Sequence, residues 1–281
     1  MNALVSVAPW LECPLCRAGL AVEAREVVCG TGHRFDIARQ GHVSLGRGAK
    51  TRHPGDTADM VRARAAFLGR GHYDRIAAAV VAGVPDEPAG LCVDLAGGTG
   101  HYLAAVLDAR AGWLGLGLDS SVPAARVAAR SHPRAASVAA DIRDRLPIAD
   151  GAAAHVLVVF GPRNGAEIAR IAAAGATVTV VTPREHHLHQ LRDAFGMIGI
   201  QPGKQQRLDD SLAPLVPVDR TDVDYRLALP RSDAVDEVLM GPSGHHLERA
   251  DVEATAARMP ETVEVTVSVT VSRYRHERSI H

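Results

Sequence analysis

The sequence predicts an α/β fold in which a doubly wound, mostly parallel sheet follows a small metal-binding module at the N-terminus. Short apolar runs such as LCVDL and HVLVV alternate with helix-like segments from residue 91 onward, and this alternation predicts the sheet. A cluster of Cys and His between residues 13 and 33 predicts the module. We therefore expect three parts: a metal-binding module over 1–45, a basic linker and helix over 46–82, and an α/β domain over 83–281.

The α/β domain can be followed element by element. Strands are expected in LCVDL, WLGLGLD, SVAADI, HVLVVFG and ATVTVVTP, and helices between them in HYLAAVLDAR, SSVPAARVAARSH and NGAEIARIAAAG. Residues 58–82 have helical spacing, Ser120 or Ser121 suits a helix cap, and Pro123 suits a first helical turn. The tail differs, because YRLALP and VEVTVSVTVSRYR are longer strands, and the second predicts an antiparallel strand at the end of the sheet.

Composition and charge exclude several classes of protein. Hydrophobic residues make up 47% and charged residues 22%, which are globular proportions. No run approaches 18 apolar residues and no secretory signal is recognisable, so we expect a cytoplasmic protein without a membrane span. The net charge of −1 hides a segment, residues 34–75, with nine basic and four acidic residues. This segment is either solvated surface or a face that binds a polyanion.

The Cys and His cluster predicts a structural metal site. Its residues have the spacing C-x2-C-x12-C-x3-H, which lets two tight turns direct four ligands at one point; they are Cys13, Cys16, Cys29 and His33. Three thiolates and an imidazole suit tetrahedral Zn²⁺, one ion per chain, and four protein ligands leave no open position for catalysis. Disulfides are the alternative, but they are disfavoured in the cytoplasm and would not need His33. Cys92 is expected to be a small core residue.

A glycine-rich turn, Val93–Gly100, ends the first expected strand and opens a helix. Glycines there let a backbone approach a ligand, and the helix N-terminus offers free N–H groups. The spacing, with Asp94, Gly98 and Gly100, resembles the turn of class I S-adenosylmethionine (SAM) methyltransferases. In that family an acid after strand two binds the ribose and an acid after strand three lies beside the adenine, as Asp119 and Asp141 could. Either acid could instead be a helix cap.

The whole chain resembles the RlmA-type 23S rRNA guanine-N1-methyltransferases. The matching stretches are CPLC, CGTGHRFDIARQGHVSL, GDTADMVRARAAFLGRGHY, VDLAGGTGHYL, GLDSS, VFGPRN, TPREHHLHQL and MGPSGHH. The form Gly161-Pro162-Arg163-Asn164 resembles the Gram-positive branch. That resemblance implies methylation of guanosine 748 in the helix 35 hairpin loop and resistance to tylosin- or mycinamicin-type macrolides. It also implies that Tyr73, Gly100, His101 and His187 contact SAM, although Tyr73 could be a packing aromatic and His187 part of a solvated face.

The catalytic base is not identified by the sequence. Guanine N1 carries a proton at neutral pH, so a base or a stabilising carboxylate is needed. Asp56 and Asp59 are candidates because they lie between the basic segment and the α/β domain, and both could instead cap the following helix. Five basic residues are expected to bind the phosphates of the RNA backbone, namely Arg34, Arg39, Arg47, Lys50 and Arg52.

Two other functions stay open at this stage. A small-molecule methyltransferase of natural-product tailoring would share the SAM domain but would not need the zinc module or the basic segment. A zinc-dependent RNA-binding regulator would have a vestigial SAM site, which the complete set of Asp94, Gly98, Gly100 and Asp119 disfavours. The sequence leaves the oligomeric state open, with a homodimer as one candidate.

Overall fold

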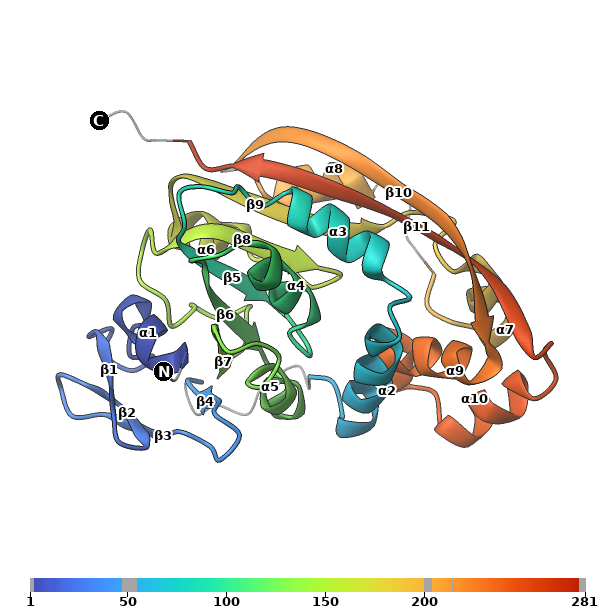
Figure 1. Ribbon diagram of the computed structural model, residues 1–281, viewed down its shortest axis with the longest axis horizontal. Coiled ribbons are helices and arrows are strands. Elements are labelled where there is room, and N and C mark those ends of the chain that lie inside the picture. Colours follow the sequence, from blue (N-terminus) through green and yellow to red (C-terminus); the bar gives the residue numbers. More distant parts are fainter. Residues whose placement is uncertain (1–2, 47–54, 200–203, 214, 278–281) are drawn as a thin grey trace.

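The central feature of the fold is a mixed sheet that runs through the length of the molecule (Figure 1). The computed structural model describes residues 3–46, 55–199, 204–213 and 215–277. Within them the sheet has eight strands in the order β10-β11-β9-β8-β5-β6-β7-β4. The strands are β4 (Val43–Ser44), β5 (Leu91–Leu95), β6 (Leu114–Asp119), β7 (Ala135–Ala139), β8 (Ala153–Val159), β9 (Ala172–Pro183), β10 (Val216–Pro230) and β11 (Thr262–Arg275).

Strand direction confirms the expected fold class. Strands β4 to β9 pair in parallel, whereas β11 is antiparallel to both β9 and β10, as the long alternating tail predicted. The predicted place of β11 at the end of the sheet is wrong, because β10 pairs outside it and forms the edge. The chain runs outward from β5 to β7 and then returns to β8 on the other side of β5. In open α/β sheets such a reversal marks the place, outside the carboxyl ends of the strands, where ligands bind. We call this region, at the carboxyl ends of β5, β6 and β8, the crevice.

Strand alternation divides the core into two layers and decides where the acidic residues point. In β5, Leu91, Val93 and Leu95 face one layer, whereas Cys92 faces the other and is fully buried there, as expected. Asp94 therefore lies on the same face as Cys92. The alternating glycines of LGLGLD admit a helix, because a Cβ at Gly115 would lie 2.7 Å from Leu107 Cδ1.

Helices cover both faces of the sheet. They are α1 (Ala3–Val7), α2 (Ala58–Gly69), α3 (Asp74–Ala82), α4 (His101–Ala109), α5 (Val122–Ala128), α6 (Gly165–Ile171), α7 (His189–Phe195), α8 (Lys204–Ser211), α9 (Arg231–Met240) and α10 (Arg249–Ala256). The single helix expected over 58–82 is wrong, because the chain turns between α2 and α3 where Gly71 has a φ of 78°. Thr57 caps α2 by accepting a hydrogen bond from Met60 N at 3.3 Å. Neither Asp56 nor Asp59 is therefore the cap.

The helix expected over residues 164–175 is also too long. It ends at Ile171, and Ala172 already belongs to β9. Alanines favour a helix, but Ala172 pairs with Ala153 of β8, and Gly175 N donates to His276 O at 2.9 Å. Tertiary hydrogen bonds therefore override the local preference.

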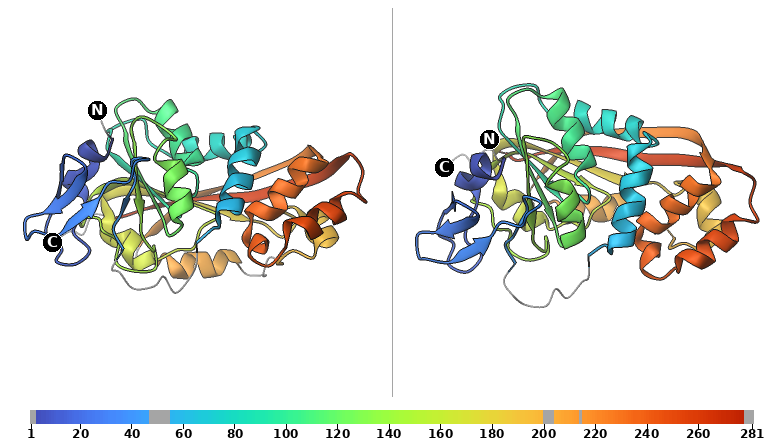
Figure 2. Two further views of the ribbon diagram at one scale, coloured as in Figure 1. Left: turned by 90° about the horizontal axis from the view of Figure 1, so that it is seen from below. Right: turned by 60° about the horizontal axis from the view of Figure 1, so that its bottom comes forward.

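The N-terminal module is fused to the sheet. Strands β1 (Leu20–Glu23), β2 (Glu26–Cys29) and β3 (Arg34–Asp36) form a small antiparallel sheet at the opposite end of the molecule from α9 and α10 (Figures 1 and 2). Val43 of β4 pairs with Val138 of β7, and Leu4, Leu11 and Leu45 share one core with β6 and β7. The sequence did not predict this pairing. The expected division at 45 and 82 stays a prediction.

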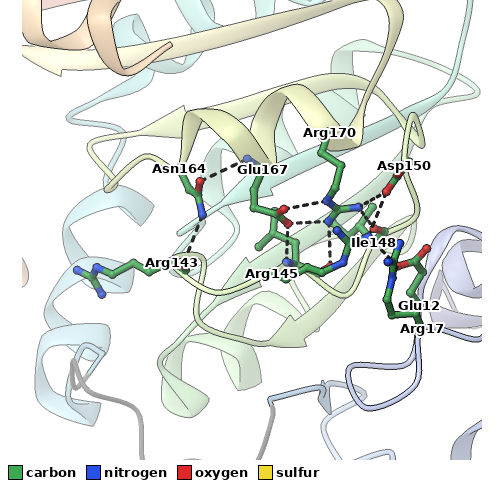
Figure 3. A network of polar contacts seen from close by, with 10 residues as sticks. Glu12, Arg17, Arg143, Arg145, Ile148, Asp150, Asn164, Glu167 and Arg170 are labelled. Carbon is green, nitrogen blue, oxygen red and sulfur yellow. Dashed lines mark hydrogen bonds and ion pairs between the residues drawn. The ribbon is translucent and has the colours of Figure 1, made fainter. Parts of the chain in front are cut away.

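A network of ion pairs also joins the module to the α/β domain (Figure 3). Glu12, the neighbour of Cys13, accepts from Arg145 at 3.4 Å. Arg145 and Arg170 both pair with Asp150, at 3.2 and 2.7 Å, and Arg170 continues to Glu167 at 2.6 Å. Glu167 N in turn donates to Asn164, which caps α6. The network therefore links the module to the loop after β8.

Helices from distant parts of the sequence cover the carboxyl end of the sheet. Helix α2 packs against α9, and α9 packs against α10 and α7. In Figures 1 and 2 these helices lie together beyond the ends of β5 and β8. We call α2, α7, α9 and α10 the helical cover. No helix of the described residues is long and apolar enough to cross a membrane.

Candidate functional site

The four expected metal ligands converge at one point of the N-terminal module. Their ligand atoms all lie within 4.8 Å of one another. Cys16 Sγ is 3.7 Å from Cys29 Sγ, and His33 Nδ1 is 3.6 Å from Cys13 Sγ and 3.4 Å from Cys29 Sγ. A tetrahedral zinc with ordinary bond lengths requires about 3.8 Å between two sulfurs and about 3.6 Å between sulfur and nitrogen. The cysteines are free, and 3.7 Å is far too long for a disulfide.

Two tight turns hold the ligands in place. Arg17 N donates to Cys13 O at 2.8 Å, and Gly32 N donates to Cys29 O at 2.9 Å, with Gly32 at a φ of 92°. The hydroxyl of Thr31 lies 2.9 Å from Cys16 Sγ and 3.1 Å from Cys29 Sγ. Its hydrogen bond lowers the pKa of Cys29 to about 5. The thiolate, which is the form that binds a metal, is therefore favoured.

The glycine-rich turn is built around three residues in the left-handed region. Ala96, Gly98 and Gly100 have φ angles of 56°, 56° and 78°. Gly97 N donates to Leu118 O at 3.1 Å, which draws the turn over the end of β6. Gly100 is the N-cap residue immediately before α4, and a Cβ there would lie 2.6 Å from Ser131 Oγ. The turn therefore presents a helix N-terminus and bare backbone at the reversal point of the sheet, as the sequence predicted.

Two aspartates flank this turn, and they differ in their hydrogen bonds. Asp119 at the end of β6 accepts from Gly98 N at 2.9 Å and from Ser121 N at 2.8 Å. Ser121, not Asp119, caps α5. Asp94 is 1% exposed, and among the described residues neither of its carboxylate oxygens has a hydrogen-bond partner. Burial raises the pKa of Asp94 to about 8.

The other expected residues lie at the margins of the same crevice. Asp141 follows β7 and accepts from Arg143 N at 3.0 Å. His101 is the first residue of α4, and burial lowers its pKa. His187 is buried, accepts from Ser268 N at 3.2 Å through Nδ1, and stacks on Phe160 with ring centroids 5.8 Å apart. His187 is therefore not part of a solvated face.

Tyr73 connects this margin to the helical cover. It is 2% exposed, and its hydroxyl donates to Glu237 Oε1 of α9 at 3.0 Å. Its ring lies 5.0 Å from Phe67 and 6.2 Å from both Phe160 and His187. Tyr73 is a packing aromatic and also one end of a buried polar pair.

The candidate bases Asp56 and Asp59 have different surroundings. Asp56 O accepts from Ser121 Oγ at 2.6 Å, and the Asp56 carboxylate pairs with Arg64 of α2 at 2.6 Å. Asp59 pairs with Arg62 on the exposed side of α2. Only Asp56 therefore lies beside the crevice.

The structure brings two residues to this point that the sequence did not predict, Arg64 and Glu237. Arg64 lies directly over the turn, because a Cβ at Gly98 would be 2.9 Å from Arg64 Nη1. Glu237 lies in an acidic C-terminal part, residues 205–264, which has six arginines and thirteen acidic residues, and nothing in this composition distinguishes it from the other acids. A signal was present in SDAVDEVLM, where Glu237 follows Asp233 at helical spacing among apolar residues that the structure shows to be buried.

Comparison with known proteins decides the family. The zinc-ribbon model described as "RlmA, N-terminal" matches residues 11–45. The 23S rRNA (guanine(748)-N(1))-methyltransferase of Streptomyces fradiae is 46% identical over 277 residues, which cover 94% of this chain and 96% of that protein. The chain belongs to the 23S rRNA (guanine-N1)-methyltransferase family. The cluster of Cys13, Cys16, Cys29 and His33 is thus the zinc centre of its ribbon.

Further relatives agree with this family. A protein of Micromonospora griseorubida that carries the provisional name 23S rRNA (guanine-N1-)-methyltransferase is 41% identical, over 95% of this chain and 97% of its own length. A solved structure of a Bacillus halodurans protein, provisionally titled a methyltransferase, superimposes with a TM-score of 0.52 at 11% identity. It covers 72% of this chain and 99% of its own chain. This structural likeness supports the methyltransferase fold of the family.

Proposed function

We propose that the chain transfers the methyl group of SAM to N1 of guanosine 748 in the helix 35 hairpin loop of 23S rRNA and confers resistance to tylosin- or mycinamicin-type macrolides. The observation that carries the proposal is the 46% identity over nearly the whole chain to a protein named for that nucleotide. The match includes the zinc ribbon, which a small-molecule methyltransferase would not need. The proposed location of the protein is the cytoplasm. The proposed oligomeric state is a homodimer, which analytical sedimentation would test.

The residues of the crevice fit the proposed cofactor. The sulfonium of SAM supplies an activated methyl group. The protein therefore has to bind and orient the cofactor and to exclude water from it. Asp119 would accept from the ribose hydroxyls, Asp141 would lie beside the adenine, and the N–H groups of Gly100 and His101 would face the ligand. The proposed set further includes Asp94, Gly98, Tyr73 and His187. Support for this set comes from the buried carboxylate of Asp94, whose two oxygens lack partners in the described residues.

The target base has to leave its stack to reach this crevice, which is easier in a hairpin loop than in a duplex. Phe160 is exposed at the end of β8 and stacks on His187, so an aromatic face is available at the mouth of the crevice. Asp56 is the better placed of the two candidate bases, although its pairing with Arg64 has to loosen before it can accept a proton.

Asp119→Ala is expected to weaken SAM binding by about 1–3 kcal/mol, roughly 5- to 150-fold, because a pair of hydroxyls would lose its acceptor. Calorimetry with S-adenosylhomocysteine (SAH) measures the change. The matched control is Asp86→Ala, which removes an 86% exposed carboxylate. Equal affinities of Asp119→Ala and the wild type would restrict Asp119 to holding the turn.

The basic segment, residues 34–75, is expected to bind RNA phosphates. Arg47, Lys50 and Arg52 lie outside the described residues. Arg34 pairs with Glu26 at 2.6 Å, whereas Arg39 is exposed. An Arg39→Ala, Arg47→Ala variant should bind SAH normally and a helix 35 hairpin more weakly, and lower salt should rescue methylation.

The salt dependence of RNA binding tests this role. Each lost phosphate contact should flatten the slope of log affinity against log salt by roughly 0.7 to 0.9. Arg249→Ala, which removes an exposed arginine from the acidic C-terminal part, is the control. If the slope and the affinity match those of the control, the basic segment is solvated surface.

A further inference from the structure

Buried polar atoms without a hydrogen-bond partner gather around the glycine-rich turn. Within the described part of the chain there are twelve such side-chain atoms, and half of them come from five residues near this turn. They are Arg64 Nε, Asp94 Oδ1, Asp94 Oδ2, His101 Nε2, Tyr102 OH and Glu237 Oε2. A polar atom buried without a partner is costly, so a cluster of them indicates a missing ligand rather than ordinary packing.

Two of these residues belong to the helical cover rather than to the sheet. Glu237 of α9 is 5% exposed, and its Oε1 already accepts from Tyr73 OH at 3.0 Å, which leaves Oε2 unused. Arg64 of α2 donates through Nη2 to Met240 O at 2.7 Å, and this oxygen terminates the helix that carries Glu237. The Arg64 guanidinium therefore ties α2 to α9 directly above Gly98.

The charges of this pair complement an amino acid. A free α-amino acid end carries an ammonium, which donates three hydrogen bonds, and a carboxylate, which accepts them. Glu237 Oε2 offers a buried acceptor. Arg64 Nη2 is taken by Met240 O and by the Asp56 carboxylate, so Arg64 would meet a ligand carboxylate through Nε, which has no partner in the described residues. Arg64 lies against the bare backbone of the turn at Gly98, and it is close enough to Glu237 for its charge to lower the pKa of that carboxyl.

We propose that Glu237 and Arg64 bind the amino acid end of SAM, with the ammonium on Glu237 Oε2 and the carboxylate on Arg64. The inference rests on the proposed function and extends it. The sheet would hold the adenosine, and the helical cover would hold the amino acid. Cofactor binding would then fix α2 against α9 and complete the wall of the crevice before RNA is methylated.

Binding of SAH and 5′-methylthioadenosine tests the inference, because methylthioadenosine lacks the amino acid end. Glu237→Gln is expected to lower SAH affinity about 10- to 100-fold and to change methylthioadenosine affinity less than about twofold. The matched control is Asp236→Asn, the neighbouring acid of α9, which pairs with Arg70 at 3.1 Å and should bind both ligands like the wild type. Equal losses for the two ligands, or no loss for SAH, would overturn the assignment.

Ligands that lack the amino or the carboxylate group of SAH test the same contacts without any change to the protein. The wild-type protein should bind deaminated SAH and decarboxylated SAH more weakly than SAH itself, by about tenfold or more each. Glu237→Gln should cause no further loss with the deaminated ligand, and Arg64→Lys should cause little further loss with the decarboxylated one. If wild-type protein binds both truncated ligands as tightly as SAH, the inference fails.

Failure of this inference can be told apart from failure of the proposed function. A wild-type protein that binds neither SAH nor methylthioadenosine would refute the SAM site as a whole. A protein that binds both, and loses both when Asp119 is replaced by Ala but not when Glu237 is replaced by Gln, would keep the SAM site. In that case Arg64 would only join α2 to α9, and Glu237 would only accept the hydrogen bond of Tyr73.

Discussion

Cys16→Ser is expected to abolish zinc binding and to unfold most of residues 11–45. Zinc contributes about 10–16 kcal/mol of apparent binding free energy in small zinc-binding peptides, and here it closes a module of three short strands. The loss should also lower the melting temperature of the whole chain, because Leu11 and Leu45 belong to the core beneath β6 and β7. SAH binding should persist, since the glycine-rich turn depends on β5 and β6.

Metal analysis and thiol titration check this result. Freshly purified wild-type protein should carry about one zinc per chain, and Cys16→Ser should carry little or none. The control is Leu15→Ser, which changes a 53% exposed residue between the two cysteines and should keep the metal. A wild-type protein that contains no zinc when purified without chelator would contradict the account.

SAM binding is expected to strengthen as pH rises from 6 to 8 and to release protons. Burial raises the pKa of both Asp94 and Glu237 to about 8, so at pH 7 most ligand-free molecules hold these protons. A cationic ligand favours the ionised carboxyls, so the complex binds fewer protons and is stabilised by higher pH. The affinity should rise by up to about tenfold per pH unit for each carboxyl and level off above about pH 8. The titratable groups that interact with the two carboxyls are Arg64, Tyr73, Cys92, Tyr102, Asp119 and Tyr225.

Calorimetry in two buffers of different ionisation enthalpy counts the protons released. Asp94→Asn and Glu237→Gln should each remove about one of the two proton releases. Methylthioadenosine, which is uncharged, serves as the control ligand and should show little dependence on pH in this range. If SAM binds with no proton release between pH 6 and pH 8, these carboxyls do not face its positive charges.

Features carried by contiguous residues could be predicted from the sequence. Strand alternation and a run of glycines suffice to place Gly98 beside Asp119, because turn and strand end meet at one edge of a parallel sheet. The four zinc ligands were equally predictable, since each pair lies within one tight turn. The antiparallel strand near the C-terminus could also be predicted, because its segment is long and alternates apolar with polar residues.

Features that depend on distant packing could not be predicted. Glu237 is buried only because α9 packs on α2, which lies more than 160 residues earlier in the chain. The end of α6 depends on pairing with β8 and on a hydrogen bond from Gly175 to His276. The pairing of β4 with β7 joins two segments whose own sequences show no sign of it.

Methylation of 23S rRNA from a strain that lacks this modification tests the central claim most directly. The purified protein, supplied with SAM, should add one methyl group to N1 of guanosine 748. Because that methyl group blocks Watson–Crick pairing, reverse transcription should stop beside this nucleotide, and Asp119→Ala should reduce the stop. Transfer to a macrolide but not to RNA, or a stop at a different nucleotide, would contradict the account.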